Sequence, residues 1–204
     1  MKTCKHCGAT LSQSETKFED IIGQEHAKRA LEVALAGDHS ITFFGNGEAT
    51  ALAEWAKAHG LTAWAMPLCP CGYYGLQTVR ECTCSLSQIS KWQKRKAFQN
   101  ALRADIVIDC PPAYPYQIEN WASGRKGEPE GGLLARVEAK GARPKTTLDE
   151  ASQSLLRAAI KQLPNIDADN MLRLAQTIAA LAKDNSIKTY HLAEAIQYRP
   201  RQRY

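Results

Sequence analysis

The chain of 204 residues is 44% hydrophobic and 23% charged, values typical of a soluble globular protein with one ordinary domain or two small ones. No apolar run approaches the roughly 20 residues that span a bilayer. The opening residues also lack the apolar stretch of a secretory signal, so we expect a cytoplasmic protein without a membrane partner. The formal net charge of +5 is modest but unevenly distributed.

Residues 1–17 begin with Cys4 and Cys7 in the pattern Cys-x-x-Cys-Gly, which is typical of a zinc knuckle. Structural disulfides rarely persist in the cytoplasm, so seven cysteines that include local pairs favour metal ligation. This knuckle supplies only two of the four ligands that a tetrahedral site needs. It is therefore either half of a zinc site or an exposed, reduced pair without metal.

Residues 18–112 alternate between helix and strand patterns. Apolar residues at three- and four-residue spacing predict a helix over 24–36, and a second helix is expected at about 50–59. Short apolar runs predict buried strands at 41–44, 61–66 and 105–110. Strands that alternate with helices predict an α/β fold with a parallel sheet and right-handed crossovers.

A glycine-rich turn joins the first strand to the following helix, the context in which backbone N–H groups hold phosphates. The turn from Gly45 through Gly47 to Thr50 nevertheless fails the chemical test. It is two residues shorter than Gly-x-x-x-x-Gly-Lys-Ser/Thr, Ala49 stands in place of the lysine, and Glu48 would repel phosphates. We interpret it as a degenerate nucleotide loop and do not expect ATP as a cofactor.

Four cysteines follow the second strand as two Cys-x-Cys pairs, Cys69 with Cys71 and Cys82 with Cys84, in an insertion over residues 69–84. Four thiolates suit tetrahedral zinc, and four protein ligands leave no open position for water, so the expected role is structural. In the alternative arrangement, the knuckle cysteines join one of these pairs and leave the other free.

Basic residues are concentrated in two places. Between Lys91 and Arg103 a predicted basic helix carries no acidic residue, and the C-terminal tail adds further arginines. These patches can neutralise nucleic-acid phosphates, but a solvated helix face and a frayed end explain the same residues. The candidate nucleic-acid-binding residues are Lys91, Lys94, Arg95, Lys96, Arg199, Arg201 and Arg203.

The remainder of the chain divides into an irregular connector at 113–146 and a helical segment at 147–204. The connector is rich in proline and glycine and contains a short predicted helix at 133–139. Three helices are expected after it, capped by Thr147 with Glu150, by Asp167 and by Thr189. Three short helices with apolar faces predict a small bundle.

Three blocks resemble the magnesium-chelatase-like AAA+ ATPases, specifically the competence-protein ComM subfamily. They are FEDIIGQEHAKRALEVALAGDHSITFFG, AMPLCPCGYYG with RECTCSLSQI, and LDEASQSLLRAAIKQL through HLAEAIQYR. The resemblance implies a truncated AAA+-like core with three parallel strands, in the order 5-1-4 of the family's numbering. It also implies that residues 147–204 form the helical lid.

The departures from this family indicate lost catalysis. The Walker A lysine is missing, and the section that carries the Walker B carboxylates is absent between Gly60 and Leu61. Pro67 stands at the sensor 1 position, and Asn170 stands at the sensor 2 position. Arg103 matches the trans-acting arginine that reaches into a neighbour's ATP site, although an ordinary surface arginine explains it equally well.

Three functions are compatible with these features. The favoured one is a non-catalytic AAA+-like protein with a structural zinc site, which acts as a regulatory or partner subunit of an intact AAA+ relative or of its own copies. The alternative is a zinc-stabilised nucleic-acid-binding protein. A functioning ATPase is the least supported, because no group that binds ATP or Mg²⁺ in cis remains.

Overall fold

The computed structural model describes residues 2–3, 10–11, 17–45, 47–75 and 81–200. At its centre is a parallel sheet of three strands, which are β3 (Ile41–Gly45), β4 (Ala63–Met66) and β5 (Ile106–Cys110). In this sheet Ile41 of β3 lies beside Ala63 of β4 on one side and beside Ile106 of β5 on the other. The predicted α/β class is therefore confirmed.

The strand order is β4-β3-β5, which is second, first, third when counted along this chain. The order that the resemblance implies is 5-1-4 in the family's own numbering. Both descriptions place β3 in the middle. Its five residues are all buried, which explains why its sequence is a continuous apolar run without alternation.

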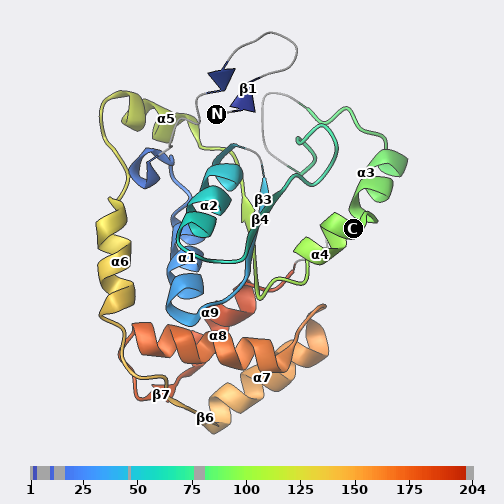
Figure 1. Ribbon diagram of the computed structural model, residues 1–204. Coiled ribbons are helices and arrows are strands. Elements are labelled where there is room, and N and C mark those ends of the chain that lie inside the picture. Colours follow the sequence, from blue (N-terminus) through green and yellow to red (C-terminus); the bar gives the residue numbers. More distant parts are fainter. Residues whose placement is uncertain (1, 4–9, 12–16, 46, 76–80, 201–204) are drawn as a thin grey trace.

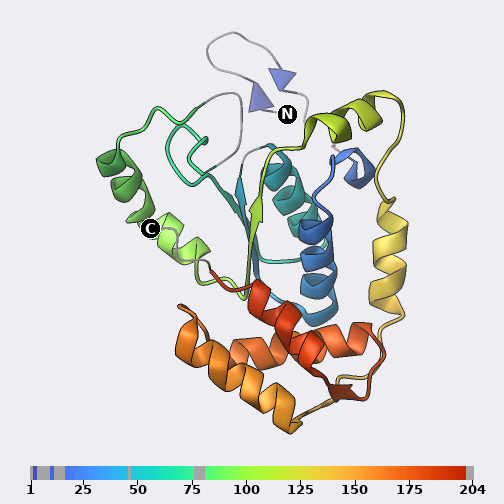
Figure 2. The same ribbon diagram turned by 180° about the vertical axis from the view of Figure 1, so that it is seen from behind.

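Helices cover both faces of the sheet (Figures 1 and 2), and they are α1 (Glu25–Gly37), α2 (Gly47–Ala58), α3 (Leu86–Gln93) and α4 (Lys96–Ala101). Ile41 and Phe43 of β3 face α1 and α2 in the main core. Phe44 faces α3 and α4, where its ring lies 5.1 Å from that of Phe98. Successive side chains of β3 therefore enter opposite layers, as the pleat of a strand requires.

The C-terminal helices pack below the sheet in Figure 1 and consist of α7 (Glu150–Gln162), α8 (Ala168–Leu181) and α9 (Thr189–Gln197). A short parallel pair, β6 (Lys145–Leu148) with β7 (Ser186–Ile187), lies among them. The group is joined to the amino end of β5. Asn170 Nδ2 donates to the carbonyl oxygen of Asp105 at 2.8 Å, and the Val107 N–H donates to that of Tyr198 at 2.8 Å.

Helix caps differ from the predictions at two of three places. Asp167 caps α8 as expected, accepting from the N–H groups of Asp169 and Asn170. The predicted cap Thr147 instead lies in β6, and α7 is capped by Asp149, whose carboxylate accepts from the Ser152 N–H at 2.7 Å. Thr147 belongs to the strand that pairs with β7, so its backbone is extended. Asp149, the next residue whose side chain can accept from helix N–H groups, is therefore the N-cap of α7. In the third helix Thr189 is the first residue of α9 and not its cap.

The connector is more helical than its composition indicates. It contains α5 (Pro115–Ala122) and α6 (Glu130–Glu138), and α6 corresponds to the helix predicted at 133–139. Leu133 anchors α6 in the main core. None of the residues of α5 is buried, so no apolar periodicity marks it in the sequence; only Pro115 at its first position is a start signal.

The N-terminal part contributes a two-stranded antiparallel pair, β1 (Lys2–Thr3) with β2 (Thr10–Leu11), and a 3-10 helix, η1 (Phe18–Asp20). Phe18 of η1 is buried and packs against Trp55 of α2, with ring centroids 4.7 Å apart. Across the described ranges of the chain, no helix combines the length and the apolar character needed to cross a bilayer.

Candidate metal centre and adjoining basic helices

The four cysteines of residues 69–84 converge in one cluster. Cys69 and Cys71 follow the end of β4, and Cys82 and Cys84 immediately precede α3. All four sulfur atoms lie within 4.8 Å of one another. The loop between β4 and α3 therefore folds back on itself and brings the two Cys-x-Cys pairs together.

The spacing of the sulfur atoms fits a tetrahedral metal site. The Sγ atoms of Cys69, Cys71 and Cys82 are separated by 3.4, 3.5 and 3.7 Å. Four sulfurs at about 2.3 Å from a central zinc would be about 3.8 Å apart, because the ligands occupy the corners of a tetrahedron. The cluster therefore has the number, type and spacing of ligands to hold a metal ion.

The turn after the first pair is shaped by glycine and by backbone hydrogen bonds to sulfur. Gly72 has a φ of +85°, a left-handed conformation that favours glycine, and its N–H donates to the carbonyl oxygen of Cys69. The N–H of Tyr74 then donates to the Cys69 sulfur at 3.3 Å. Such bonds stabilise thiolate charge, so the backbone is arranged for a ligand rather than for a neutral thiol.

The thiols of the cluster titrate at different pH values. The hydrogen bond from the Tyr73 backbone is the main reason that the pKa of Cys71 is lowered to about 6. Burial, together with the neighbouring Cys71 and Cys69 sulfurs, raises the pKa of Cys82 to about 12. The thiolate form of Cys71 is thus favoured, whereas the raised pKa values of Cys82 and Cys84 favour their protonated thiols. A cation would be required to hold all four as thiolates, and it would release those protons on binding.

Cys110 does not belong to this cluster. Cys110 is buried at the end of β5, and burial raises the pKa of its thiol. Cys4 and Cys7 lie outside the described residues. The arrangement in which they pair with one of the two Cys-x-Cys couples therefore stays a prediction.

The basic segment after the cluster forms two helices and not the single helix that the sequence predicts. α3 starts at Leu86 behind Ser85, which accepts from the Gln88 N–H in a capping box. The chain then turns at Lys94 and Arg95 before α4. Because of this break, Phe98 packs into the smaller core cluster with Phe44 of the sheet. Trp92 packs beside the same cluster, and its indole N–H donates to the Pro67 carbonyl oxygen.

The four basic side chains at this break are all exposed, and they are Lys91, Lys94, Arg95 and Lys96. The guanidinium of Arg95 lies over the Trp92 ring, 4.5 Å from its centroid. In the tail, Arg199 is half-buried and donates to the Ile196 carbonyl oxygen. Arg201 and Arg203 lie outside the described residues. The exposed part of the predicted basic surface therefore lies at the break between α3 and α4, and α3 connects it to the cysteine cluster.

The predicted nucleotide loop is almost eliminated. β3 extends to Gly45, α2 begins at Gly47, and only residue 46 separates them. A side chain at Gly45 would approach the Cys110 carbonyl oxygen to 2.5 Å, so this glycine permits close strand packing. Gly47 has open space around it, and Thr50 is exposed on α2. Helix α2 also starts three residues earlier than predicted.

Two further positions of interest lie at the opposite end of the sheet from this junction. Asn170 bonds to Asp105, just before β5, whereas Gly45 pairs with Cys110 at its carboxyl end. The length of β5, five residues, places Asn170 about 16 Å from the junction between β3 and α2. Arg103 is exposed and lines a hollow of about 550 Å³ that Asn170 also lines.

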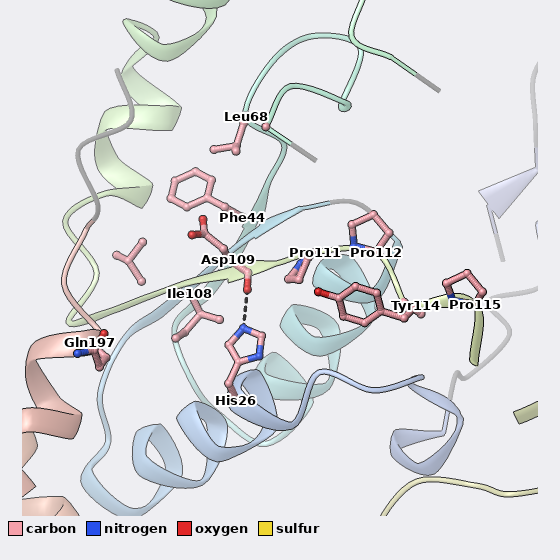
Figure 3. A pocket seen from close by; sticks show the side chains of 13 residues that line it. His26, Phe44, Leu68, Ile108, Asp109, Pro111, Pro112, Tyr114, Pro115 and Gln197 are labelled. Carbon is pink, nitrogen blue, oxygen red and sulfur yellow. Dashed lines mark hydrogen bonds between the residues drawn. The ribbon is translucent and has the colours of Figure 1, made fainter. Parts of the chain in front are cut away.

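Sequence analysis did not identify a cavity at the carboxyl end of β5, which is lined by His26, Asp109 and Tyr114 among others. His26 and Asp109 are 83 positions apart in the sequence, yet His26 Nε2 contacts the Asp109 carbonyl oxygen at 2.7 Å (Figure 3). No local spacing in the sequence marks such a site. The only available signal is that Asp109 and the two prolines after Cys110 end a buried strand.

Two family models match this chain. The model for magnesium chelatase, subunit ChlI, matches residues 17–58, which contain α1, β3 and α2. The model for the C-terminal part of the same subunit matches residues 117–199, which contain α6 and all the C-terminal helices. The cysteine cluster lies between the two matched ranges. A search of curated proteins found no match. The two models together span well over half of the chain, which therefore belongs to the magnesium-chelatase-like family.

Proposed function

We propose that this chain is a shortened, non-catalytic member of its family, related to the ComM subfamily, that acts as a regulatory or partner subunit and carries a structural zinc ion. The observation that carries the proposal is the junction between Gly45 and Gly47. A phosphate loop needs several backbone N–H groups and a lysine around the β-phosphate, and one intervening residue does not provide them.

The electrostatics of this junction support the same conclusion. Glu48 lies in the first turn of α2, where a nucleotide-binding helix would direct its positive end at phosphate. Burial is the main reason that the pKa of Cys110 is raised, and the charges of Asp109 and Glu48 add to it, so two carboxylates act on the same end of the sheet. Hydrolysis without a lysine, a metal-holding carboxylate or a sensor residue would lose the main sources of transition-state stabilisation.

Zinc is the proposed metal because four thiolates at tetrahedral spacing are its preferred structural environment. Cys69, Cys71, Cys82 and Cys84 would all be ligands, which leaves no position open for a catalytic water. The ion would tie the end of β4 to the start of α3. Its role would thus be to hold the basic helices in place against the sheet.

Association with an intact relative tests the proposed role. The chain is mixed with a magnesium-chelatase-like ATPase that retains its Walker motifs, and binding is followed by analytical ultracentrifugation. We expect a complex at micromolar concentration and a changed ATPase rate of the relative. Arg103→Ala tests the candidate trans-acting arginine, and Arg125→Ala, which changes an exposed arginine of the connector, is its control. No association at micromolar concentration would contradict the proposal.

Nucleic-acid binding is the second candidate function. Its support is the exposed group of Lys91, Lys94, Arg95 and Lys96 at the break between α3 and α4, without an acidic residue among them. Fluorescence anisotropy with a labelled single-stranded oligonucleotide measures it. If the group contacts phosphates, affinity falls steeply as salt rises, and the Lys94→Ala and Lys96→Ala double variant lowers the slope by about two. An affinity that does not depend on salt excludes this function.

A further inference from the structure

A groove of about 400 Å³ follows one face of α3 and ends at the break before α4. Leu86, Ile89 and Gln93 line it from α3, and their spacing of three and four residues places them on one face of the helix. Lys94 lines it at the break, and Tyr74 lines it from the loop that carries the cysteines. Figures 1 and 2 place α3 at the outer edge of the molecule, on the other side of the sheet from α1. A partner can therefore reach this side of the molecule.

The groove is apolar at the end where α3 begins. Leu86 is 78% exposed, whereas Ile89, one turn further along the helix, is buried. A single exposed leucine is ordinary on a protein surface. Here it adjoins a groove with Ile89 at its base, and an exposed apolar patch with a polar rim is typical of a surface that binds another protein.

The cysteine cluster positions both sides of this groove. The Tyr74 N–H donates to the Cys69 sulfur at 3.3 Å. On the other side, Leu86 is two residues after Cys84 and directly follows the N-cap Ser85. A groove whose sides are already held in place costs less conformational entropy when a partner binds.

The other end of the groove is positively charged. Residues 85–104 contain five basic residues and no acidic one. Lys94 lines the groove itself, and Lys91, Arg95 and Lys96 are exposed around the same break. This end therefore attracts anionic groups, which are carboxylates on a protein or phosphates on a nucleic acid.

The lining of the groove favours a protein over a nucleic acid. Tyr74 is the one aromatic residue among the described residues that line it, and the nearby Trp92 ring is already covered by the Arg95 guanidinium, 4.5 Å from its centroid. The side-chain amides of Gln93 and Gln99 already donate to backbone carbonyl oxygens, at 3.1 and 2.8 Å. Bases therefore find few rings on which to stack, whereas aliphatic side chains fit the apolar end.

We propose that this groove binds an acidic amphipathic helix of a partner protein. Leucine-like side chains of that helix would pack on Leu86 and Ile89, and its carboxylates would lie at Lys94 and the exposed basic residues beside it. The eight residues of α3 span about 12 Å, which matches about two turns of a partner helix. The inference rests on the proposed partner role, because it names one surface at which a partner is held.

The probe is a fluorescein-labelled peptide of fourteen residues that repeats Leu-Glu-Glu-Leu-Leu-Glu-Glu twice. Its binding to the full chain is followed by fluorescence anisotropy. We expect saturation at micromolar concentration and at least tenfold weaker binding of two matched peptides. In one of these peptides serine replaces every leucine, and in the other glutamine replaces every glutamate. Labelled oligothymidylate of fourteen nucleotides is the nucleic-acid comparison.

Variants of the chain locate the bound peptide. Leu86→Ala removes the exposed apolar edge and should weaken the peptide about fivefold, and Lys94→Ala should weaken it about threefold. Ile160→Ala and Lys161→Ala, which change exposed residues of α7, are the matched controls and should leave the affinity unchanged. Circular dichroism confirms that the variants fold.

The proposal is wrong if the serine-substituted peptide binds as well as the leucine peptide, or if Leu86→Ala and Ile160→Ala have equal effects. Tighter binding of oligothymidylate, weakened by Lys94→Ala but not by Leu86→Ala, would assign the surface to a nucleic acid instead. Self-association of the chain that Leu86→Ala abolishes would assign it to a second copy. If the peptide does not bind while a complex with an intact relative still forms, the groove is excluded and the partner role stands; the absence of both contradicts both.

Discussion

His39 links two parts of the fold through one buried titratable side chain. It is 3% exposed in the turn between α1 and β3, and its Nε2 lies 2.9 Å from Oγ1 of Thr177 in α8. Burial lowers the pKa of its imidazole to about 4, although the Asp105 carboxylate favours the charged form. The neutral ring is therefore the form that stabilises the folded chain.

The pH dependence of stability follows from this shift. The folded pKa lies below the unfolded value of about 6.5, so the stabilisation is complete above that pH and is lost as the pH falls toward 4. We expect His39 to lower the free energy of unfolding by about 3 kcal/mol across this interval. Urea unfolding at several pH values measures it. His39→Gln removes this part of the slope, and an unchanged slope in the variant contradicts the assignment.

The cysteine cluster makes a prediction about metal content. We expect the purified chain to contain about one metal ion, as a tetrahedral site does. Cys71→Ser removes one of the four ligands, so this variant should lose most of the metal. Cys110→Ala, which changes a buried cysteine outside the cluster, should keep it. Inductively coupled plasma mass spectrometry measures both. If Cys4→Ser removes the metal and Cys71→Ser does not, the N-terminal knuckle holds the ion instead.

At the scale of elements, the break between α3 and α4 is set by core packing. Phe98 is 1% exposed and fills the smaller core cluster together with Phe44. The charges of residues 91–103 indicate one continuous basic helix. The packing of two aromatic side chains, Trp92 and Phe98, divides this stretch into two helices. Both Trp92 and Phe98 must reach the sheet side, and a change of direction at Arg95 permits this.

Phe98→Ala tests the contribution of this layer. Truncation of a fully buried phenylalanine removes its transfer free energy and leaves a cavity, so the free energy of unfolding should fall by about 3–5 kcal/mol. Leu86→Ala is the control, because Leu86 is 78% exposed at the start of α3 and should change stability by less than about 0.5 kcal/mol. Chemical unfolding followed by tryptophan fluorescence compares them. Similar losses in the two variants would contradict this packing.

Helix and strand types were predictable at this scale where apolar spacing was regular. The strands at 41–44 and 105–110 and the helices of the C-terminal group follow from their apolar patterns. Helix α5 could not be predicted, because its apolar side chains face outward. The cap at Asp149 and the β6–β7 pair depend on contacts between distant residues, which no local pattern contains.

At the scale of the whole molecule, Asp105 joins the sheet to the C-terminal helices. Its carboxylate accepts from the Ser40 N–H at 2.9 Å and from the Ser40 hydroxyl at 2.8 Å, and it pairs with Arg173 of α8. Burial alone would raise its pKa, but these bonds lower it. Asp105 thus bonds both to Ser40, in the turn before β3, and to Arg173, in the first half of α8.

Asp105→Ala should therefore weaken the contact between the two parts. Loss of hydrogen bonds to a charged group costs about 2–3 kcal/mol, and the Arg173 guanidinium loses its partner at the same time. Glu138→Ala, an exposed carboxylate on α6, is the control and should change stability little. Hydrogen exchange of α8 amides measures the effect. Protection of α8 that is equal in both variants would show that Asp105 does not hold the helices to the sheet.

The cluster of four cysteines could be predicted from the sequence, because residue type and local pairing are visible in the two Cys-x-Cys pairs. The position of Asn170 could not: the family resemblance implies a place near a nucleotide, whereas the fold puts it at the amino end of β5. The cavity at Asp109 was missed for a related reason. Its polar groups come from α1, from β5 and from the segment before α5, which only the folded chain brings together.

The proposed function requires that the junction between β3 and α2 does not bind a nucleotide. Isothermal titration calorimetry of the purified chain with ATP and Mg²⁺ tests it most directly. Because one residue separates Gly45 from Gly47, and Glu48 lies where phosphate would bind, we expect no heat of binding up to millimolar ATP. Saturable, magnesium-dependent binding of ATP at micromolar concentration would contradict the account.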